Sequence, residues 1–406
     1  MPFKIAELKI LNYPKYLFFC FSLLLFYCDL GNEQILAGPQ GPQFDINLFE
    51  QNLIDYVNWG GDQPVGWAYA ITQNGRLEKW GAFGNAVQEP DGTTVAMTID
   101  KEINIASVTK FYTAIVVMQL LEELNLSIHT TIDSYLPPSW VVGPNIDGLT
   151  FAHLLRHESG LDTGNTDFNN TLSYDGIKQA IEDGVGVPPP DQADYDNINF
   201  AIFRILIPSL QNNLPNAPLA NLDSDQTTQA TYRSYMQKAL FDKIGLSNID
   251  FTEESNNPTR YYNVNDITNN ISGINYGDWD NISGGGGYYM SVIEMAAVNA
   301  FFQHSNAIVS DDARNTIKDN YFGLDSYFNG DSRELYGKYY GKNGSISNDG
   351  DPTVGQGVLT QIQMFPINGV EIAVAVNSRG VTYKTGFDGF LRSSIKDAYN
   401  DAWIDP

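Results

Sequence analysis

The stretch Ser107-Val108-Thr109-Lys110 opens an apolar run, residues 111–123, that predicts a helix. Positions i and i+3 of a helix share a face, with Cβ atoms about 5–6 Å apart, so the Lys110 amine is expected beside the Ser107 hydroxyl. An amine whose pKa is lowered by burial can accept the serine proton. The helix N-terminus also favours negative charge on an attacked carbonyl. The stretch therefore predicts an acyl-transfer enzyme with a serine nucleophile and no catalytic histidine.

A Ser-x-x-Lys pattern is weak by itself, because the chain carries a second one from Ser393 to Lys396. That second match lies in a predicted amphipathic helix without companion motifs, and we interpret it as solvated surface. The alternative interpretation of Ser107 is a residue that caps the helix, with Lys110 exposed to solvent. Two later motifs favour the catalytic interpretation.

The second motif is Tyr195-Asp196-Asn197, which precedes a predicted helix at residues 198–207. A tyrosine held near a lysine can share its proton and serve the nucleophile or the leaving group. The Asn197 amide can hydrogen-bond a substrate amide. Asp196 is expected either to raise the pKa of Tyr195 or to face solvent. The alternative is a loop tyrosine followed by a helix-capping asparagine.

The third motif is Lys342-Asn343-Gly344-Ser345, just before a predicted hairpin. A cation at Lys342 can hold a substrate carboxylate, and Asn343 places a hydrogen-bonding side chain beside it. Gly344 lets a substrate backbone approach closely. The N–H groups of Ser345 and Ser107 can form an oxyanion hole. The alternative is a polar turn. The acidic turn 348–351 is expected to border the groove and to disfavour anionic substrates.

In order and context, the three motifs resemble those of the serine β-lactamase and penicillin-binding protein superfamily. The similarity is greatest to the branch of class C β-lactamases, D-alanyl-D-alanine carboxypeptidases and esterases. Segments 153–161, 284–287 with Ser291, and 361–377 are also similar, and the resemblance covers roughly residues 45–400. It implies that Ser107 is the nucleophile, that Lys110 and Tyr195 share its activation, and that Asn197 holds substrate. It also implies that Lys342 lies on the strand beside the groove.

The third motif departs from the resemblance, because many lactamases and carboxypeptidases have Thr or Ser where this chain has Asn343. The expected function is a serine hydrolase that acylates Ser107, with small peptide, amide or ester substrates and cell-wall peptide ends as the first candidate. One alternative is a carboxylesterase of the same fold. Another is a sensor that binds β-lactam or peptidoglycan without turnover. No metal or organic cofactor is expected.

Charge and composition exclude one class of partner. The 406 residues include 48 acidic and 23 basic side chains, for a formal charge of −25. Nucleic acid is not an expected partner, since its phosphates need Lys and Arg. This acidity suits a secreted protein in salty surroundings or simply an ordinary soluble one. The expected partner is a small-molecule or peptide substrate.

The N-terminus is expected to be a targeting segment, residues 1–28. Three lysines precede an apolar run at 16–27 that fits a signal peptide and is short for a membrane span. Cys28 ends this run, so lipidation, simple cleavage and an uncleaved anchor are all open. Each places the body outside the cytoplasm, whether secreted, periplasmic or lipid-anchored. Membrane attachment is expected only through this segment, and residues 29–44 are expected to be a linker.

The order of predicted elements gives the fold class α+β. A helix at 45–59 and a hairpin around Asn74-Gly75 come first, and a hairpin around 366–369 and a helix at 387–403 come last. Between them lie mostly helices, with a helical subdomain at about 125–280. We expect one domain, residues 45–400: an antiparallel sheet built from both chain ends, flanked by the terminal helices, with the helical part inserted. This is the β-lactamase/DD-peptidase-like arrangement that the resemblance implies.

His153 and His157 are spaced four residues apart, as in some metal sites. No glutamate follows His153 at the required place. We therefore interpret both histidines as helix-packing residues and predict no metal site.

Overall fold

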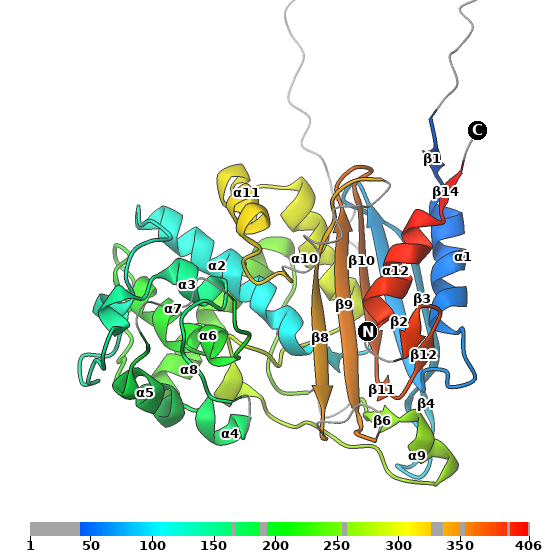
Figure 1. Ribbon diagram of the computed structural model, residues 1–406, viewed down its shortest axis with the longest axis horizontal. Coiled ribbons are helices and arrows are strands. Elements are labelled where there is room, and N and C mark those ends of the chain that lie inside the picture. Colours follow the sequence, from blue (N-terminus) through cyan, green and yellow to red (C-terminus); the bar gives the residue numbers. More distant parts are fainter. Residues whose placement is uncertain are drawn as a thin grey trace, which may run out of the picture. The chain divides into compact units, whose positions relative to one another are not determined.

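Strands from both ends of the chain build one antiparallel sheet at the centre of the fold (Figure 1). The computed structural model describes residues 41–404, except 165–166, 187–192, 254–257, 326–335, 350–353 and 388–389. Residues 42–405 form one compact unit. The predicted targeting segment 1–28, with Cys28, and residues 29–40 of the predicted linker lie outside the described residues.

The five long strands lie in the order β8-β9-β10-β2-β3, each antiparallel to its neighbours. Their bounds are Gly66–Gln73 (β2), Arg76–Val87 (β3), Tyr340–Ser347 (β8), Gly357–Phe365 (β9) and Val370–Val376 (β10). Three short strands extend the sheet: Val95–Ala96 (β4) beside β3, Tyr262–Asn263 (β6) beside β9, and Ser378–Arg379 (β11) beside β6. Strands from the two ends of the chain therefore meet where β10 pairs with β2.

The central strands are covered on both faces, so β9 and β10 are buried along their whole length. This explains their continuous apolar runs in place of a polar alternation. One face of β2 presents Trp67, Tyr69 and Ile71 to a core with the terminal helices, Ile46–Val57 (α1) and Leu391–Asn400 (α12). The opposite face presents Ala68 and Ala70 to the larger core, where Val292–His304 (α10) covers the sheet. Small side chains on this face allow α10 to lie close to the strands.

The terminal helices pack through aromatic rings. Phe365 of β9 stacks on Tyr399 of α12 with ring centroids 3.7 Å apart, and Phe49 of α1 meets both rings edge-on. The Asp45 side chain caps α1 by accepting from the N–H groups of its first turn. Two short strands, Gln43–Phe44 (β1) and Trp403–Ile404 (β14), pair next to these helices.

The chain between β3 and β8 is mostly helical. Its α-helices are Thr109–Glu123 (α2), Phe151–Leu155 (α3), Phe168–Thr171 (α4), Tyr174–Asp183 (α5), Ile198–Ala201 (α6), Phe203–Asn212 (α7), Asp225–Met236 (α8), Val264–Thr268 (α9), α10 and Asp311–Asn320 (α11). Its short strand Ile103–Asn104 (β5) pairs with Tyr289–Met290 (β7). Its short 3-10 helices are Ala106–Val108 (η1), Asp133–Tyr135 (η2), Ile146–Gly148 (η3), Asp242–Ile244 (η5) and Asp280–Ile282 (η6), and Gln237–Phe241 (η4) is a π-helix. Serine side chains cap α5, α8, α10 and α11 at their N-termini.

The predicted fold class is confirmed: a mixed α+β fold with a sheet, terminal helices and a helical insertion. Some helix boundaries differ from the prediction, because residues at the helix ends form strand pairs in place of helical hydrogen bonds. The predicted last helix, 387–403, is shorter in the structure because Phe387 belongs to the strand pair Thr382–Tyr383 (β12) and Gly386–Phe387 (β13), and Trp403 belongs to β14. The prediction also missed α11, whose Ser310 cap and buried Ala313 and Ile317 are a recognisable helix signal.

Among the helices of the described segments, none combines the length and the apolar character needed to cross a membrane.

Candidate active site

Ser107 lies at the junction between strand β5 and helix α2, where the backbone turns sharply. Ala106 has φ +50°, a left-handed conformation that non-glycine residues adopt only when their surroundings impose it. Here the Ala106 N–H donates to Asn104 Oδ1 at 2.9 Å, and the Ile105 carbonyl accepts from Thr360 Oγ1 of β9 at 2.8 Å. These bonds hold Ser107 at the start of a buried helix, between that helix and the sheet.

Lys110 is fully buried behind Ser107 on the first turn of α2. Its Nζ lies 3.1 Å from Ser107 Oγ and donates to Asn197 Oδ1 at 2.7 Å and to the Gly285 carbonyl oxygen. Burial lowers the pKa of Lys110 below its usual value, and the positive charge of Lys342 lowers it further. The alternative of an exposed lysine is wrong.

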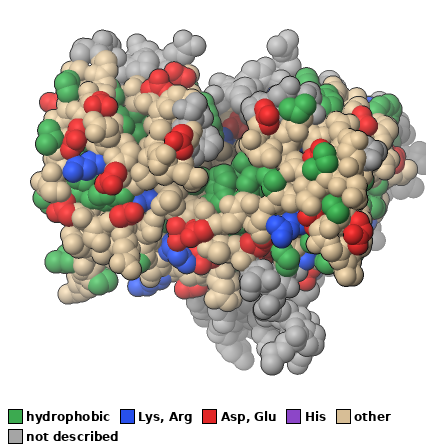
Figure 2. Space-filling model, turned by 90° about the horizontal axis from the view of Figure 1, so that it is seen from below, with side chains coloured by type: hydrophobic (Ala, Val, Ile, Leu, Met, Phe, Trp, Pro, Cys, Tyr) green, Lys and Arg blue, Asp and Glu red, His purple; other side chains and the backbone are tan. Residues whose placement is uncertain are grey.

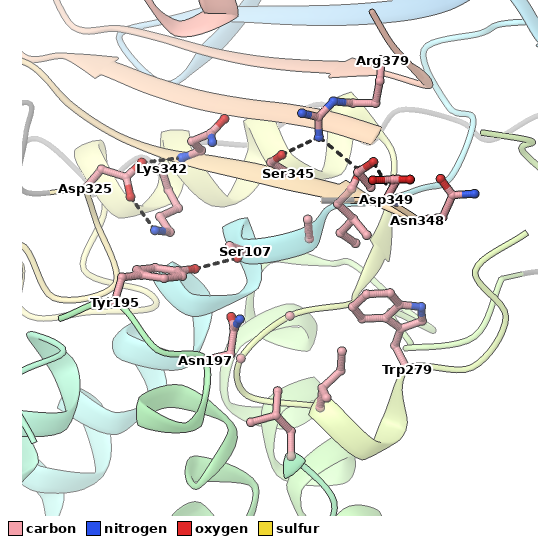
Figure 3. Close-up of a pocket in the computed structure, with 18 of the residues that line it drawn as sticks. Ser107, Tyr195, Asn197, Trp279, Asp325, Lys342, Ser345, Asn348, Asp349 and Arg379 are labelled. Carbon is pink, nitrogen blue, oxygen red and sulfur yellow. Dashed lines mark hydrogen bonds and ion pairs between the residues drawn. The ribbon is translucent and has the colours of Figure 1, made fainter. Parts of the chain in front are cut away.

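Tyr195 approaches Ser107 from the helical part of the chain, just before α6. Its hydroxyl lies 2.9 Å from Ser107 Oγ (Figure 3). The Nζ atoms of Lys110 and Lys342 each lie 5.1 Å from its ring centroid. Burial of the hydroxyl would raise the pKa of Tyr195. The two lysine charges and the hydrogen bonds from Lys110 and Ser107 outweigh this and lower the pKa below its usual value.

One interpretation offered for Asp196, a side chain that faces solvent, is wrong. Its side chain is buried, so it does not face solvent. Instead it accepts from the N–H of Ile198, the first residue of α6, at 2.9 Å and from the Thr163 N–H at 2.6 Å. The net shift of the Tyr195 pKa is downward, opposite to the direction offered for Asp196. Asp196 therefore fastens the second motif to its helix and to the loop at Thr163.

His157 is a site residue that the sequence interpretation missed. Helix α3 ends at Leu155, and His157 follows it with φ +60° rather than continuing the helix that contains His153. Its ring stacks on Tyr195 with centroids 4.4 Å apart, and its Nδ1 lies 3.0 Å from the Asp196 carbonyl oxygen. Burial, with the charges of Lys110 and Lys342, holds its pKa well below the usual value. The structure therefore supports Tyr195 with an uncharged imidazole.

The third motif lies on β8, the strand at the edge of the sheet nearest Ser107. Gly344 pairs with Thr360 of β9, and a Cβ at Gly344 would lie only 2.4 Å from the Ile105 carbonyl oxygen. A side chain at this position would therefore push β8 away from the segment that carries Ser107. Glycine is required here by close packing within the protein, in addition to the predicted approach of substrate.

Replacing Gly344 with alanine is expected to lower the free energy of unfolding by about 1–3 kcal/mol, because the added methyl has no space. Urea titration followed by circular dichroism measures this change. Gly148→Ala is the matched control, since a Cβ there meets no atom within 4 Å. Equal losses of stability in the two variants would contradict the packing argument.

Lys342 is not an isolated cation. Its Nζ forms an ion pair with Asp325 Oδ1 at 2.5 Å, and both side chains are almost completely buried. The second oxygen of Asp325 accepts from the Asn343 N–H at 2.7 Å. The carboxylate therefore holds the lysine and the start of the motif together. No motif in the sequence pointed to Asp325.

At the other end of the motif, Ser345 Oγ accepts from the Arg379 guanidinium at 2.7 Å. Arg379 lies on β11 and also donates to the Ile346 carbonyl oxygen at 3.3 Å. In Figure 3, Lys342, Asp325 and Tyr195 lie to one side of Ser107, whereas Arg379, Asp349 and Trp279 lie to the other side.

A cavity of about 860 Å³ joins these groups. Six predicted site residues line it: Ser107, Tyr195, Asn197, Lys342, Asn343 and Ser345. Lys110 and Gly344 lie behind the lining residues: Lys110 bonds to Asn197, and Gly344 lies between Asn343 and Ser345 on β8. Asn348 and Asp349, from the predicted acidic turn, also lie on its wall, as expected. Leu172, Trp279 and Ile282 add an apolar wall from the helical part.

The face of the molecule in Figure 2 is hollowed near its middle, with hydrophobic side chains exposed there and acidic and basic side chains spread around. Among the residues whose positions are described, no three His, Cys, Asp or Glu side chains gather as metal ligands would.

Comparison with known proteins places these features in a family. The sequence model of the Beta-lactamase family matches residues 58–387. A curated relative, "Penicillin-binding protein 4" of Amycolatopsis lactamdurans, is 32% identical over 123 residues, which cover 29% of this chain and 32% of that protein. The match therefore spans about a third of the length of that relative.

Solved structures share the fold at low sequence identity. A β-lactamase/D-alanine carboxypeptidase from Pseudomonas syringae is 13% identical, with a TM-score of 0.62 over 87% of this chain and 98% of that one. EstCE1, a hydrolase with promiscuous acyltransferase activity, is 14% identical, with a TM-score of 0.64 over 87% and 99%. These likenesses concern the fold, and the family match over most of the sequence shows that the chain belongs to the β-lactamase family.

Proposed function

We propose that this protein is a serine hydrolase that forms an acyl-enzyme on Ser107 and acts on small peptide, amide or ester substrates, as β-lactamase-related enzymes do. One observation carries the proposal: Ser107 Oγ lies 3.1 Å from the buried Lys110 Nζ and 2.9 Å from the Tyr195 hydroxyl. A serine hydroxyl between two such groups has a proton acceptor within reach, as nucleophilic catalysis requires. The cavity beside it has room for a small substrate.

The contacts of Lys110 fit an uncharged amine that acts as a base. A neutral amine has two N–H donors and one lone pair. The donors are taken by Asn197 Oδ1 and the Gly285 carbonyl oxygen. The remaining direction is toward Ser107 Oγ and the neighbouring Tyr195 hydroxyl, so the lone pair can accept a proton from this pair of hydroxyls. In this mechanism Asn197 orients the base, in addition to the predicted contact with substrate.

Acylation then follows in one addition and one elimination. Ser107 Oγ attacks the substrate carbonyl carbon, and its proton moves to Lys110 or to an ionised Tyr195. The N–H groups of Ser107 and Ser345 stabilise the oxyanion. When the carbonyl re-forms, the bond to the leaving group breaks, and Tyr195 gives that group a proton. Water, activated near Tyr195, later attacks the acyl-enzyme and returns a proton to Ser107.

The proposal is tested by labelling the protein separately with a fluorescent penicillin and a fluorophosphonate and mapping the adduct by peptide mass spectrometry. We expect one adduct, on Ser107. An adduct on another serine, or no adduct with either probe in the folded protein, would reject the assignment. Penicillin labelling that never decays would identify a sensor instead of an enzyme.

A carboxylesterase of the same fold is the second candidate function. The observation in its favour is the Asp325–Lys342 ion pair, together with Asn343 in place of Thr or Ser. Both weaken the expected binding of a substrate carboxylate, which an ester does not need. Labelling by fluorophosphonate alone, with turnover of an activated ester, would favour this candidate.

We also propose that the protein works outside the cytoplasm, either secreted, periplasmic or lipid-anchored. This rests on the lysines and the apolar run before Cys28. N-terminal sequencing of the mature protein from its native cells would reveal cleavage, and a mass shift on Cys28 would reveal lipidation.

A further inference from the structure

The position of Tyr195 divides the site into an acyl side and a leaving-group side. This argument rests on the proposed function, in which Tyr195 protonates the leaving group. The leaving group must therefore lie on the Tyr195 side of Ser107, and the acyl group must extend the other way, toward Trp279 and Arg379 (Figure 3). A polar side chain on the Tyr195 side of Ser107 therefore interacts with the leaving group and not with the acyl group.

A second cavity, of about 450 Å³, begins on this leaving-group side. Tyr195, Lys342 and Asp325 line both cavities, so the second cavity borders the first on the side where the leaving group lies. Its wall also includes Arg156, Glu158 and Asp319. The Arg156 guanidinium lies 3.8 Å from Glu158, and Lys342 is paired with Asp325. Each cation of this wall therefore has a carboxylate neighbour, and Asp319 adds a third carboxylate.

In the Asp325–Lys342 pair, the Asp325 carboxylate neutralises the positive charge of Lys342, which would otherwise attract a substrate carboxylate. An anion beside Lys342 would also lie beside Asp325, whose oxygens are fixed by Lys342 and by the Asn343 N–H. Both side chains are almost fully buried, where solvent screens such repulsion weakly. A neutral leaving group is not repelled by Asp325.

We propose that Asp325 determines specificity by rejecting leaving groups that carry a carboxylate, so that the substrates are esters or amides with uncharged leaving groups. Free peptide C-termini are then poor substrates, although the enzyme keeps the nucleophile and bases of its family. A unit charge about 5 Å away in a partly buried site changes binding or rate by roughly 10- to 100-fold.

Two thioesters with one acyl group test the proposal. One releases mercaptopropionate, which carries a carboxylate, and the other releases mercaptopropionamide, which is neutral. A colorimetric thiol reagent follows release, and each kcat/KM is divided by the rate of hydroxide-catalysed hydrolysis of the same thioester. We expect the wild-type protein to prefer the neutral leaving group by at least about 10-fold. A wild-type preference for the anionic one would overturn the proposal without any variant.

Asp325→Asn keeps the shape of the side chain and removes its charge. We expect it to shift the ratio of the two kcat/KM values toward the anionic substrate by roughly 10- to 100-fold. Taking the ratio cancels effects on Ser107, Lys110 or folding that both substrates share. Asp147→Asn is the matched control, because Asp147 is exposed on η3 and lines neither cavity. An unchanged ratio in Asp325→Asn, or an equal shift in Asp147→Asn, would overturn the proposal.

The results also separate this inference from the proposed function. If the neutral thioester is hydrolysed in a Ser107-dependent way and the ratio does not respond to Asp325, only the specificity argument fails. If wild-type protein hydrolyses neither thioester, or if Ser107→Ala hydrolyses both equally well, the proposed function fails and the inference fails with it.

Discussion

Ser107→Ala is expected to abolish covalent labelling and to lower kcat/KM for the neutral thioester by roughly 10⁴- to 10⁶-fold. The reason is geometric: Lys110 Nζ and the Tyr195 hydroxyl both meet at Ser107 Oγ. Removing this one atom leaves two bases without a nucleophile. Thiol release under steady-state conditions measures the rate, and intact-protein mass spectrometry measures the adduct.

The chain provides its own control for this experiment. Ser393 and Lys396 repeat the Ser-x-x-Lys spacing on α12, a terminal helix on the far face of the sheet from α10. Ser393→Ala should keep wild-type labelling and turnover. If Ser393→Ala and Ser107→Ala had the same effect, or if Ser107→Ala were still acylated, the assigned nucleophile would be wrong.

Lys110→Met is expected to lower kcat/KM by roughly 10²- to 10⁴-fold, the usual contribution of a positioned general base. Methionine has about the length of lysine but cannot accept a proton, and it removes a buried amine without opening a large cavity. Thermal unfolding should show that the variant remains folded. Lys396→Met, from the second Ser-x-x-Lys pair, should retain full activity.

The pH profile of the wild-type enzyme gives a second readout of the same group. Lys110 and Tyr195 titrate as a coupled pair, and both pKa values lie below their usual ones. Activity requires loss of a proton from this pair, so kcat/KM should rise with increasing pH along an acid limb. In Lys110→Met, Tyr195 keeps the charge of Lys342 but loses that of a protonated Lys110, which also lowers its pKa, so the remaining acid limb should move to higher pH. An acid limb at the same pH in Lys110→Met as in the wild type would show that Lys110 does not share a proton with Tyr195.

The parts of the site that could be predicted are those with local sequence signals. Ser107 lies in η1, which leads directly into α2 with Lys110, and Tyr195 and Asn197 directly precede α6, so each pair is close in sequence to a recognisable helix start. The hairpin around Asn74-Gly75 was equally predictable, since that dipeptide favours a tight turn. It joins β2 and β3, and Asn74 and Gly75 both have positive φ.

Residues without a local signal could not be predicted. Asp325 reaches Lys342 because its own N–H donates to the Gly341 carbonyl oxygen at 3.0 Å, a pairing that no spacing rule foretells. His157 reaches Tyr195 because α3 ends at Leu155, two residues before it, and the chain then turns with positive φ. Asp196 was misjudged for the same reason: its partner, Thr163, is distant in sequence. Each of these contacts depends on how segments that are distant in sequence pack together. No local sequence pattern predicts that packing.

The pairing of β2 with β10 also has a consequence for how the chain folds. Thr72 of β2 bonds to Glu371 of β10 across 299 positions of sequence. During synthesis the β2–β3 hairpin is made early, and its inner edge has no neighbour until β10 follows nearly 300 residues later. Closing so long a loop slows folding and leaves an apolar strand edge exposed meanwhile. The last third of the chain therefore sets the time at which the sheet forms and at which β8 can take its place beside Ser107.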